Sequence, residues 1–356
     1  MPDSSISGRK ADHIELCAQG DVGFRETSTL FGCVRLVHDA LPDLKLSEVD
    51  TSLTLLGKPL RAPLVIASMT GGTEQAERIN RELAAIAEER GYAFGLGSQR
   101  AMHVRPSTAP TYKVRDVAPT ALVLGNVGVV QARAMTTSEV RLLLDEAGAD
   151  ALCVHLNPAM ELVQPGGDRD FSQGLATIQR LVEGVGRPVM VKETGCGLSA
   201  AVARRLRAVG VRHVDVSGAG GTSWVGVETL RAEAGGDARS RDLGRSLWDW
   251  GIPTAASVAL VAPLGLETVV ATGGVASGVD VAKAIALGAH AAGLARPVLK
   301  ALMSGGRSAA AELLEGIEAE LRAVMLLTGS RDLAMLRRAA RVVTGELRAW
   351  LLLDGA

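Results

Sequence analysis

The stretch from residue 151 to residue 171 places potentially reactive side chains directly after an apolar run. Ala151–Val154 has the length and composition of a buried strand, and His155, Asn157 and Glu161 follow it within seven positions. A histidine can donate to a phosphate or ligate a metal, an asparagine can bind a ligand oxygen, and a glutamate can hold Mg²⁺. In α/β folds, ligand sites lie where parallel strands end, so this stretch predicts one. Taken alone, it would also fit a polar strand end that caps the next helix.

Six other apolar runs end in polar or glycine clusters. These clusters are Ser68-Met69-Thr70-Gly71-Gly72, Gly97-Ser98-Gln99-Arg100, Asn126, Lys192-Glu193, the Ser217 to Thr222 segment, and Gly273-Gly274. A single cluster of this kind is usually turn chemistry. Seven are better explained if the runs are parallel strands whose carboxyl ends converge on one mouth.

Two of these ends predict a cofactor that carries a phosphate. Thr272-Gly273-Gly274-Val275 and the short turn at 296–299 would let backbone N–H groups and a helix N-terminus approach an anion. A glycine turn without a ligand is the alternative.

Lys192 closes a strand that is otherwise apolar, where burial would be costly unless an anion or an electron-rich ring faced it. A strand-end lysine beside a reduced flavin would satisfy this requirement, and a structural ion pair with Glu193 is the alternative. Thr222 would donate to a flavin carbonyl or phosphate. Trp224 would pack beside the substrate, although a lone tryptophan is more often a core residue.

Basic groups from distant parts of the chain are candidates for binding a diphosphate. Arg9, Lys10 and Arg100, together with His155, would form a cationic clamp, with Mg²⁺ held between Glu161 and the diphosphate oxygens. Each of these basic residues alone would fit an ordinary surface charge. We find no Ser/His/Asp pattern and no Cys–His metal spacing.

The elements that must position these groups are eight short apolar strands separated by helical segments. The expected strands cover residues 63–68, 93–98, 121–126, 151–157, 188–193, 213–218, 267–274 and 291–295. Helical periodicity is clearest over 74–90, 137–147, 199–209 and 279–287, and each of these segments is followed by a glycine.

Eight strand–helix units predict an α/β fold, a (β/α)₈ TIM barrel with an N-terminal extension and C-terminal helices. A doubly wound sheet is less favoured, because no Gly-x-Gly-x-x-Gly follows the first strand. We expect a single domain over residues 1–356, with a substrate-clamping arm at 1–60, the barrel at 61–305 and two helices from Ser308 within a C-terminal part at 306–356. The polar residues 231–239 predict a lid-like sixth loop.

Composition narrows the functional classes. The chain has 356 residues, is 47% hydrophobic but only 3% aromatic, and carries a net charge of −1. These values argue against nucleic-acid binding, and no apolar run approaches the ~20 residues of a membrane span. The polar N-terminus and four cysteines without metal-type spacing suggest a cytoplasmic protein with reduced thiols.

The ordered motifs resemble those of the type II, FMN-dependent isopentenyl diphosphate isomerases over nearly the whole chain. The resemblance rests on residues 9–14, 68–72, 97–100, 155–157, 167–171, 220–224 and 272–274. It implies a barrel that holds FMN and Mg²⁺, uses NADPH to reduce the flavin and interconverts isopentenyl and dimethylallyl diphosphates, with reduced flavin as acid and base. We expect a homo-oligomer that acts on this small prenyl diphosphate.

The resemblance also implies roles for individual residues. Those expected to hold FMN are Ser68, Met69, Thr70, Ser98, Asn126, Lys192, Thr222, Gly273, Gly274, Ala295 and Arg296. Those expected to hold the substrate are Arg9, Lys10, Ser98, Gln99, Arg100, His155 and Asn157, and Glu161 is expected to hold the metal.

Two positions depart from the family pattern. Met160 stands where the family has Gln before the metal-binding Glu161, and Gly166 stands where it usually has Glu. A thioether cannot donate a hydrogen bond or relay a proton, so no side chain is assigned as catalytic. Three hypotheses remain: ordinary isomerisation by the flavin alone, an FMN-dependent relative acting on another prenyl diphosphate or as an oxidoreductase, and an inactive binding protein. Turnover with pre-reduced FMN distinguishes the third from the others.

Overall fold

The barrel is built from eight parallel strands in a closed ring. The computed structural model describes residues 3–355 and orders the strands β10-β11-β4-β5-β6-β7-β8-β9. The strands are β4 (Leu64–Ile66), β5 (Ala93–Gly95), β6 (Leu122–Gly128), β7 (Ala151–Leu156), β8 (Val189–Glu193), β9 (His213–Asp215), β10 (Thr268–Thr272) and β11 (Ala291–Leu294). Each expected strand is present, which confirms the predicted (β/α)₈ barrel.

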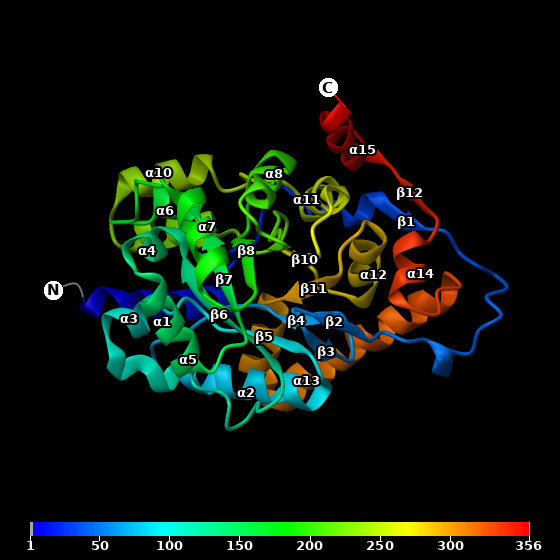
Figure 1. The fold of residues 1–356 in the computed structure, drawn as a ribbon. Helices are drawn as coiled ribbons and strands as arrows, with labels where there is room; N and C mark the ends of the chain where they lie inside the picture. Colours follow the sequence, from blue (N-terminus) through cyan, green and yellow to red (C-terminus); the bar gives the residue numbers. More distant parts are fainter. Residues whose placement is uncertain (1–2, 356) are drawn as a thin grey trace.

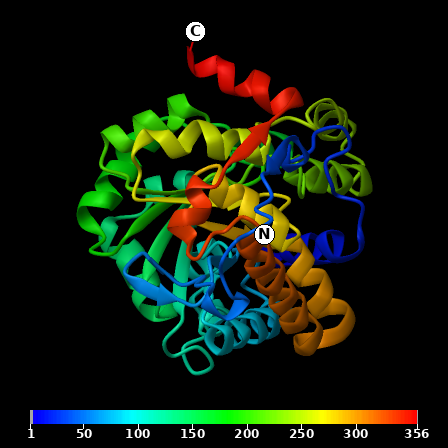
Figure 2. The same cartoon turned by 90° about the vertical axis from the view of Figure 1, so that its right-hand side faces the viewer.

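Helices surround the ring of strands (Figures 1 and 2). Those between β4 and β8 are α2 (Glu74–Arg90), α3 (Arg100–Val104), η3 (Pro106–Tyr112), α4 (Val129–Ala134), α5 (Thr137–Ala147), α6 (Pro158–Val163) and α7 (Gly174–Gly184). Those after β8 are α8 (Ala200–Ala208), α9 (Trp224–Ala234), α10 (Ala238–Ser246), α11 (Thr254–Val261), η4 (Ala262–Leu264), α12 (Gly278–Ala286) and α13 (Arg296–Leu327).

Local capping explains why the helix bounds follow the sequence pattern closely. The Thr73 hydroxyl accepts from the backbone at the start of α2, and Gly91 ends that helix in the left-handed region at φ 69°. Helix α5 begins with a capping box between Thr136 and Glu139 and ends at Gly148, φ 66°. These signals lie within a few residues of each helix, so they are visible in the sequence.

Residues 231–239, which were expected to form a lid-like loop after the sixth strand, are mostly helical. They belong mostly to α9 and α10, which form a helix pair. The Ser223 side chain caps α9, and the Asp237 side chain caps α10 after a short break at Gly235 and Gly236. Two good N-caps therefore order a stretch whose polarity and glycines resembled a loop.

The chain outside the barrel contributes further elements. Before it come α1 (Asp3–Gln19), η1 (Phe31–Cys33), β1 (Val34–Leu36), η2 (Leu46–Glu48), β2 (Leu53–Leu55) and β3 (Lys58–Leu60). After α13 come α14 (Leu333–Arg338), β12 (Arg341–Val343), α15 (Gly345–Leu351) and η5 (Leu352–Gly355). Helix α13 is interrupted at Gly306, whose φ of 69° and ψ of −166° are not helical, so a second helical segment begins close to Ser308, where the sequence predicted the first C-terminal helix. Strand β12 pairs antiparallel with β1. Figure 1 shows α15 projecting from one edge of the molecule.

Strand register brings the functional strand ends together. His155 on β7 is the register partner of Lys192 on β8, and Lys192 is in turn the partner of Asp215 on β9. Register partners in a parallel sheet present their side chains to the same face. Three residues far apart in sequence therefore lie in one row at the mouth of the barrel. Within the described residues, no helix has the length and apolar character needed to cross a bilayer.

Candidate active site at the mouth of the barrel

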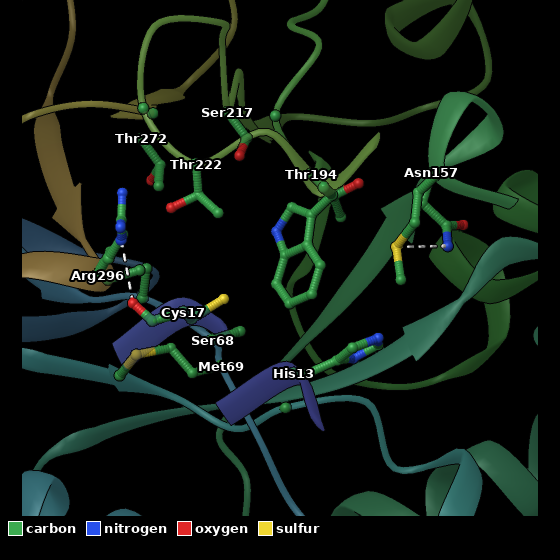
Figure 3. A pocket seen from close by; sticks show the side chains of 18 of the residues that line it. His13, Cys17, Ser68, Met69, Asn157, Thr194, Ser217, Thr222, Thr272 and Arg296 are labelled. Atoms are coloured by element: carbon green, nitrogen blue, oxygen red, sulfur yellow. Dashed lines mark hydrogen bonds between the residues drawn. The ribbon is translucent and has the colours of Figure 1, made fainter. Parts of the chain in front are cut away.

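A cavity of about 650 Å³ opens where the barrel strands end, and α1 supplies part of its wall. Figure 3 shows Ser217, Thr222 and Thr272 on one side of it, Asn157 on another, and His13 and Cys17 on α1. The predicted site residues that line it are Arg9, Lys10, Ser68, Met69, Thr70, Ser98, Arg100, Asn126, His155, Asn157, Glu161, Lys192, Thr222, Gly273, Gly274, Ala295 and Arg296. Its size lies within the range of small-molecule and cofactor sites.

Gln99 is the predicted site residue that the structure does not bring to the cavity. It is fully buried, its amide nitrogen donates to the Leu143 carbonyl at 3.0 Å, and its amide oxygen accepts from the Asn126 backbone at 2.9 Å. The side chain of Gln99 therefore does not line the cavity in which a substrate contact was expected. Gln99 supports the strand that carries Asn126, because its amide oxygen accepts from the backbone of that strand.

Two glycine segments, Gly220-Gly221 and Gly273-Gly274, line one end of the cavity and are here called the glycine cradle. Gly273 has φ 109°, and a Cβ atom there would lie 2.1 Å from the Gly218 carbonyl oxygen. A Cβ atom on Gly221 would lie 2.3 Å from the Gly274 nitrogen. Side chains are excluded on both sides, so backbone polar groups line this end, as a phosphate requires.

The Thr70 hydroxyl is independent evidence that this cavity suits a polar ligand. Its hydroxyl is buried and has no hydrogen-bond partner within residues 3–355, and Thr70 lines the cavity. A buried hydroxyl without a partner costs free energy, whereas a polar ligand would satisfy it. Together with the glycine cradle, this fits a cofactor with phosphate and carbonyl groups such as FMN.

Lys192 forms its ion pair with Asp215, and the alternative pair with Glu193 is not formed. The Lys192 Nζ to Asp215 Oδ2 distance is 2.7 Å, and the Thr272 hydroxyl donates to the same oxygen at 2.9 Å. Side chains alternate between the two faces of a strand, so Lys192 and Glu193 point in opposite directions. The Asp215 carboxylate thus holds the lysine at the floor of the cavity.

Glu193 binds the backbone of the loop that follows β8. One of its carboxylate oxygens accepts from the backbone N–H groups of Thr194 and Gly195, at 2.7 and 2.8 Å, and these two residues line the cavity. Burial raises the pKa of Glu193 to about 7, against the lowering effect of these hydrogen bonds. Its carboxylate therefore shapes the loop after β8.

His155 is a neutral group in this cavity. Its Nδ1 lies 2.8 Å from the Asn126 side-chain oxygen, and the Asn126 amide nitrogen donates to the Leu96 carbonyl. This pattern assigns the proton to Nδ1. Burial, together with Lys192, lowers the pKa of His155 to about 4. With His155 neutral, the positive charges near the cavity that were expected to form the clamp belong to Arg9, Lys10 and Arg100.

The Glu161 carboxylate is buried and accepts three hydrogen bonds. Asn157 Nδ2 donates to it at 2.9 Å, the Asp168 backbone at 2.9 Å and Gln164 Nε2 at 3.3 Å. Among the described residues, no group of three or more His, Cys, Asp or Glu side chains is arranged to hold a metal. A lone carboxylate fits Mg²⁺ only if a ligand such as a diphosphate supplies further oxygens.

Met160 also lines the cavity, where the family pattern has Gln. The Asn157 amide lies 3.9 Å from its sulfur, within range of a weak hydrogen bond. Asn157 therefore contacts both the sulfur of Met160 and the carboxylate of Glu161.

Helix α1 is tied to the barrel by residues whose pairing the sequence did not reveal. His13 Nε2 lies 2.7 Å from Glu228 Oε1, and the His13 ring packs edge-on against Trp224, with 5.1 Å between centroids. Arg231 donates to the other Glu228 oxygen at 2.7 Å. Although His13 belongs to the motif at 9–14, nothing local indicated a carboxylate more than two hundred residues away. Burial lowers the pKa of His13 despite this carboxylate.

Arg296 fastens the other end of α1. Its Nε donates to the Cys17 carbonyl at 3.0 Å, and its second terminal nitrogen donates to the Gly20 carbonyl at 2.5 Å (Figure 3 shows the first bond). These carbonyls belong to the C-terminal end of the helix, where acceptors lack intrahelical donors. A predicted cofactor residue therefore also anchors the segment that covers the cavity.

Comparisons with known proteins agree with this architecture. The family model described as FMN-dependent dehydrogenase matches residues 3–156 and 167–343. The isopentenyl-diphosphate delta-isomerase of Methanothermobacter thermautotrophicus is 44% identical over 347 residues, 97% of this chain and 96% of that protein. The protein of the same name from Synechococcus sp. is 46% identical over 338 residues, 94% of this chain and 96% of that protein.

Solved structures show the same fold at much lower identity. The recombinant flavin-binding domain of baker's yeast flavocytochrome b2 aligns with a TM-score of 0.69 at 21% identity, over 93% of this chain and 81% of that chain. Mandelate oxidase bound to a difluoro-hydroxy acid aligns with a TM-score of 0.64 at 17% identity, over 96% of this chain and 99% of that chain. The full-length matches at above 40% identity confirm the resemblance seen in the motifs, and the chain belongs to the FMN-dependent dehydrogenase family and, within it, to the type II isopentenyl-diphosphate delta-isomerases.

Proposed function

We propose that this chain interconverts isopentenyl and dimethylallyl diphosphates, with FMN and Mg²⁺ bound and NADPH as the reductant of the flavin. One observation carries the proposal: a single cavity joins a glycine cradle and the unpaired Thr70 hydroxyl to the cations of α1 and the lone Glu161 carboxylate. The names of the relatives support the same reaction.

For FMN, the proposed holders are the cavity residues at the strand ends. Backbone groups around Gly273 and Gly274 would hold the phosphate, Thr70 and Thr222 would pair with polar atoms, and Lys192 would face the ring. Ser68, Met69, Ser98, Asn126, Ala295 and Arg296 complete this proposed set. Reduced FMN supplies an electron-rich ring and groups able to give and take a proton.

For the substrate, the proposed clamp is divided between α1 and the strand ends. Arg9, Lys10 and Arg100 would neutralise the diphosphate, with Ser98 and Asn157 as neutral partners. His155 would contact it as a neutral imidazole. The arm formed by residues 1–60 would thus close the substrate into the barrel mouth.

The proposed metal site uses Glu161 alone from the protein. Its three hydrogen bonds hold the carboxylate in place, and Mg²⁺ would bind between it and the diphosphate oxygens. Metal binding should therefore depend on the diphosphate.

The wall of the cavity would protect the reacting alkene. Trp224 and Met160 line it with apolar surface, which excludes water from the developing positive charge. Asn157 would orient the end of the substrate beside Glu161.

Met160 favours one alternative function. A thioether in place of the family Gln makes this part of the wall more apolar, which would suit another prenyl diphosphate or an oxidoreductase reaction. Protein that is fully loaded with FMN but does not convert isopentenyl diphosphate would favour this alternative.

The decisive experiment incubates purified protein with pre-reduced FMN, Mg²⁺ and isopentenyl diphosphate without oxygen, and follows the dimethylallyl product by NMR. We expect conversion that requires both reduced flavin and Mg²⁺. Glu161→Gln should raise the KM sharply and weaken the dependence on metal. Conversion that persists unchanged in EDTA would refute the metal assignment, and absence of conversion in fully FMN-loaded protein would refute the reaction.

A further inference from the structure

Lys10 reaches the cavity from α1, and two neutral oxygens hold its ammonium group. Lys10 Nζ donates to the Tyr112 hydroxyl at 2.7 Å and to the Ser98 carbonyl at 3.2 Å. The Tyr112 hydroxyl donates its own proton to the same Ser98 carbonyl at 2.7 Å, so its lone pairs face Lys10. An ammonium group has three N–H bonds, and these contacts use two of them. One N–H bond is left for a ligand in the cavity that Lys10 lines.

The neutral character of these acceptors matters because, among the residues that the structure describes, no carboxylate is found to offset the charge of Lys10. The charged groups that act most strongly on Lys10 are Arg9 on the same helix and Arg105 beside η3, and both are positive. Together with burial they lower the pKa of Lys10 to about 7. An acceptor without charge directs the ammonium form and does not neutralise it, so its positive charge stays available to an anion.

Tyr112 itself is held in one position. Its side chain is fully buried, and a Cβ atom on Gly71 would lie 2.1 Å from its ring carbon Cε1. The neighbouring Thr111 hydroxyl accepts from the Gly72 backbone at 2.7 Å, and the Thr111 carbonyl accepts from the Asn80 side chain at 2.8 Å. The 3₁₀ segment η3 is therefore locked beneath the loop after β4, and the hydroxyl cannot leave Lys10 without disturbing both.

We propose that Tyr112 is a positioning residue for substrate binding, whose hydroxyl directs the remaining Lys10 N–H toward a diphosphate oxygen in the cavity. This inference rests on the proposed function in one respect, that Lys10 binds the diphosphate. Tyr112 does not itself line the cavity.

The first test compares two tyrosine variants. Tyr112→Phe removes the hydroxyl and keeps the packed ring. Tyr92→Phe is a matched control, because Tyr92 is equally buried and donates to Glu318 at 2.7 Å away from the cavity lining. Calorimetry on the FMN-loaded protein with Mg²⁺ and inorganic pyrophosphate should show about three- to tenfold weaker binding for Tyr112→Phe and no change for Tyr92→Phe.

The second test asks whether Tyr112 acts through Lys10. Lys10→Ala alone should weaken pyrophosphate binding by about ten- to hundredfold. Adding Tyr112→Phe to Lys10→Ala should then have no further effect, because the group that it positions is gone. A purely structural role would instead add its full effect in both backgrounds, which would overturn the inference.

A pH profile gives a readout that packing damage does not change. Loss of an acceptor disfavours the charged ammonium, so the pKa of Lys10 should fall further in Tyr112→Phe. Affinity for pyrophosphate should then decline at a lower pH than in the wild type, with the ionisation of pyrophosphate common to both.

The outcomes separate the two proposals. If FMN-loaded wild type binds no pyrophosphate, the proposed function fails and this inference fails with it. If wild type binds it and Lys10→Ala weakens binding, but Tyr112→Phe matches wild type in affinity and pH profile, only the role of Tyr112 is overturned.

Discussion

At the scale of single residues, Met160 is the position where this chain has a thioether although the family pattern has the amide of Gln. Its sulfur accepts a weak hydrogen bond from Asn157 and borders Glu161 in the cavity. A thioether cannot relay a proton, so any proton transfer here must be carried by other groups.

We expect Met160→Gln to change the isomerisation rate by less than about tenfold, because the proposed acid and base is the reduced flavin. A positioned proton relay is typically worth ~10²–10⁴-fold. The measurement is kcat with pre-reduced FMN, Mg²⁺ and isopentenyl diphosphate, with Met160→Leu as a control for the loss of sulfur. A gain of the size of a proton relay in Met160→Gln alone would contradict the flavin-only interpretation.

His155 makes a pH-dependent contribution to stability. A histidine ordinarily has a pKa of about 6.5, whereas burial and Lys192 lower that of folded His155 to about 4. Between these values the unfolded chain takes up a proton at this site and the folded chain does not. Folding therefore becomes less favourable as the pH falls through this window.

We expect the thermal midpoint of unfolding to decline from pH 6.5 to pH 4.5, and His155→Asn to reduce that decline. The difference should correspond to about 1–3 kcal/mol in the free energy of unfolding, since each pKa unit is ~1.4 kcal/mol. His290, whose pKa is also lowered to about 4, remains in both proteins and cancels in the comparison. If the thermal midpoint declined equally with pH in both proteins, the pKa of His155 would not be lowered by folding.

At the scale of elements, two attachments fix α1 over the cavity, as its proposed role as a clamp requires. Glu228 on α9 binds His13 near the middle of the helix, and Arg296 at the start of α13 binds the carbonyls at its end. The cations Arg9 and Lys10 depend on this docking for their places in the cavity.

Glu228→Gln should loosen α1 and weaken pyrophosphate binding about tenfold or more, since it removes a buried charge shared by two partners. The flavin spectrum should be kept. The rate of limited proteolysis within residues 8–20 measures how firmly α1 is docked on the barrel. Calorimetry measures the affinity for pyrophosphate. Glu233→Gln is the control, because Glu233 lies on the same helix in an exposed pair with Arg245. Equal proteolysis rates in both variants would count against the clamp.

At the scale of the whole molecule, the cofactor would complete the core of the barrel mouth. The cavity holds about 650 Å³ between the strand ends and α1, and the buried Thr70 hydroxyl lacks a partner among the described residues. A ligand that fills this space in the folded state and not in the unfolded state stabilises the fold.

FMN should raise the thermal midpoint of unfolding, by an amount equivalent to about 2.7 kcal/mol at a hundredfold excess over its Kd. Gly273→Ala should lose this shift, because its Cβ atom would meet the Gly218 carbonyl at 2.1 Å and its φ is 109°. Gly316→Ala, on α13 with nothing within 4 Å of its Cβ position, should keep the shift. Retention of full FMN stabilisation by Gly273→Ala would show that this segment is not the cradle.

The barrel, its strands and the bounds of several helices could all be predicted from the amino-acid sequence. Those features depend on apolar runs, helical periodicity and caps such as Thr73 and Gly91, all of which act within a few residues. Cavity residues at strand ends were also predictable, because parallel strands end on the same side.

The contacts between groups that are far apart in the chain became visible only in the folded structure. Strand register selected Asp215 as the partner of Lys192, and folding brought the Tyr112 hydroxyl next to Lys10. Folding also placed the Leu143 carbonyl where the buried Gln99 amide donates to it. The pairing of β1 with β12 likewise joins segments from opposite ends of the chain. Such contacts join residues that are far apart in the chain. Local sequence patterns, which extend over only a few residues, therefore cannot predict them.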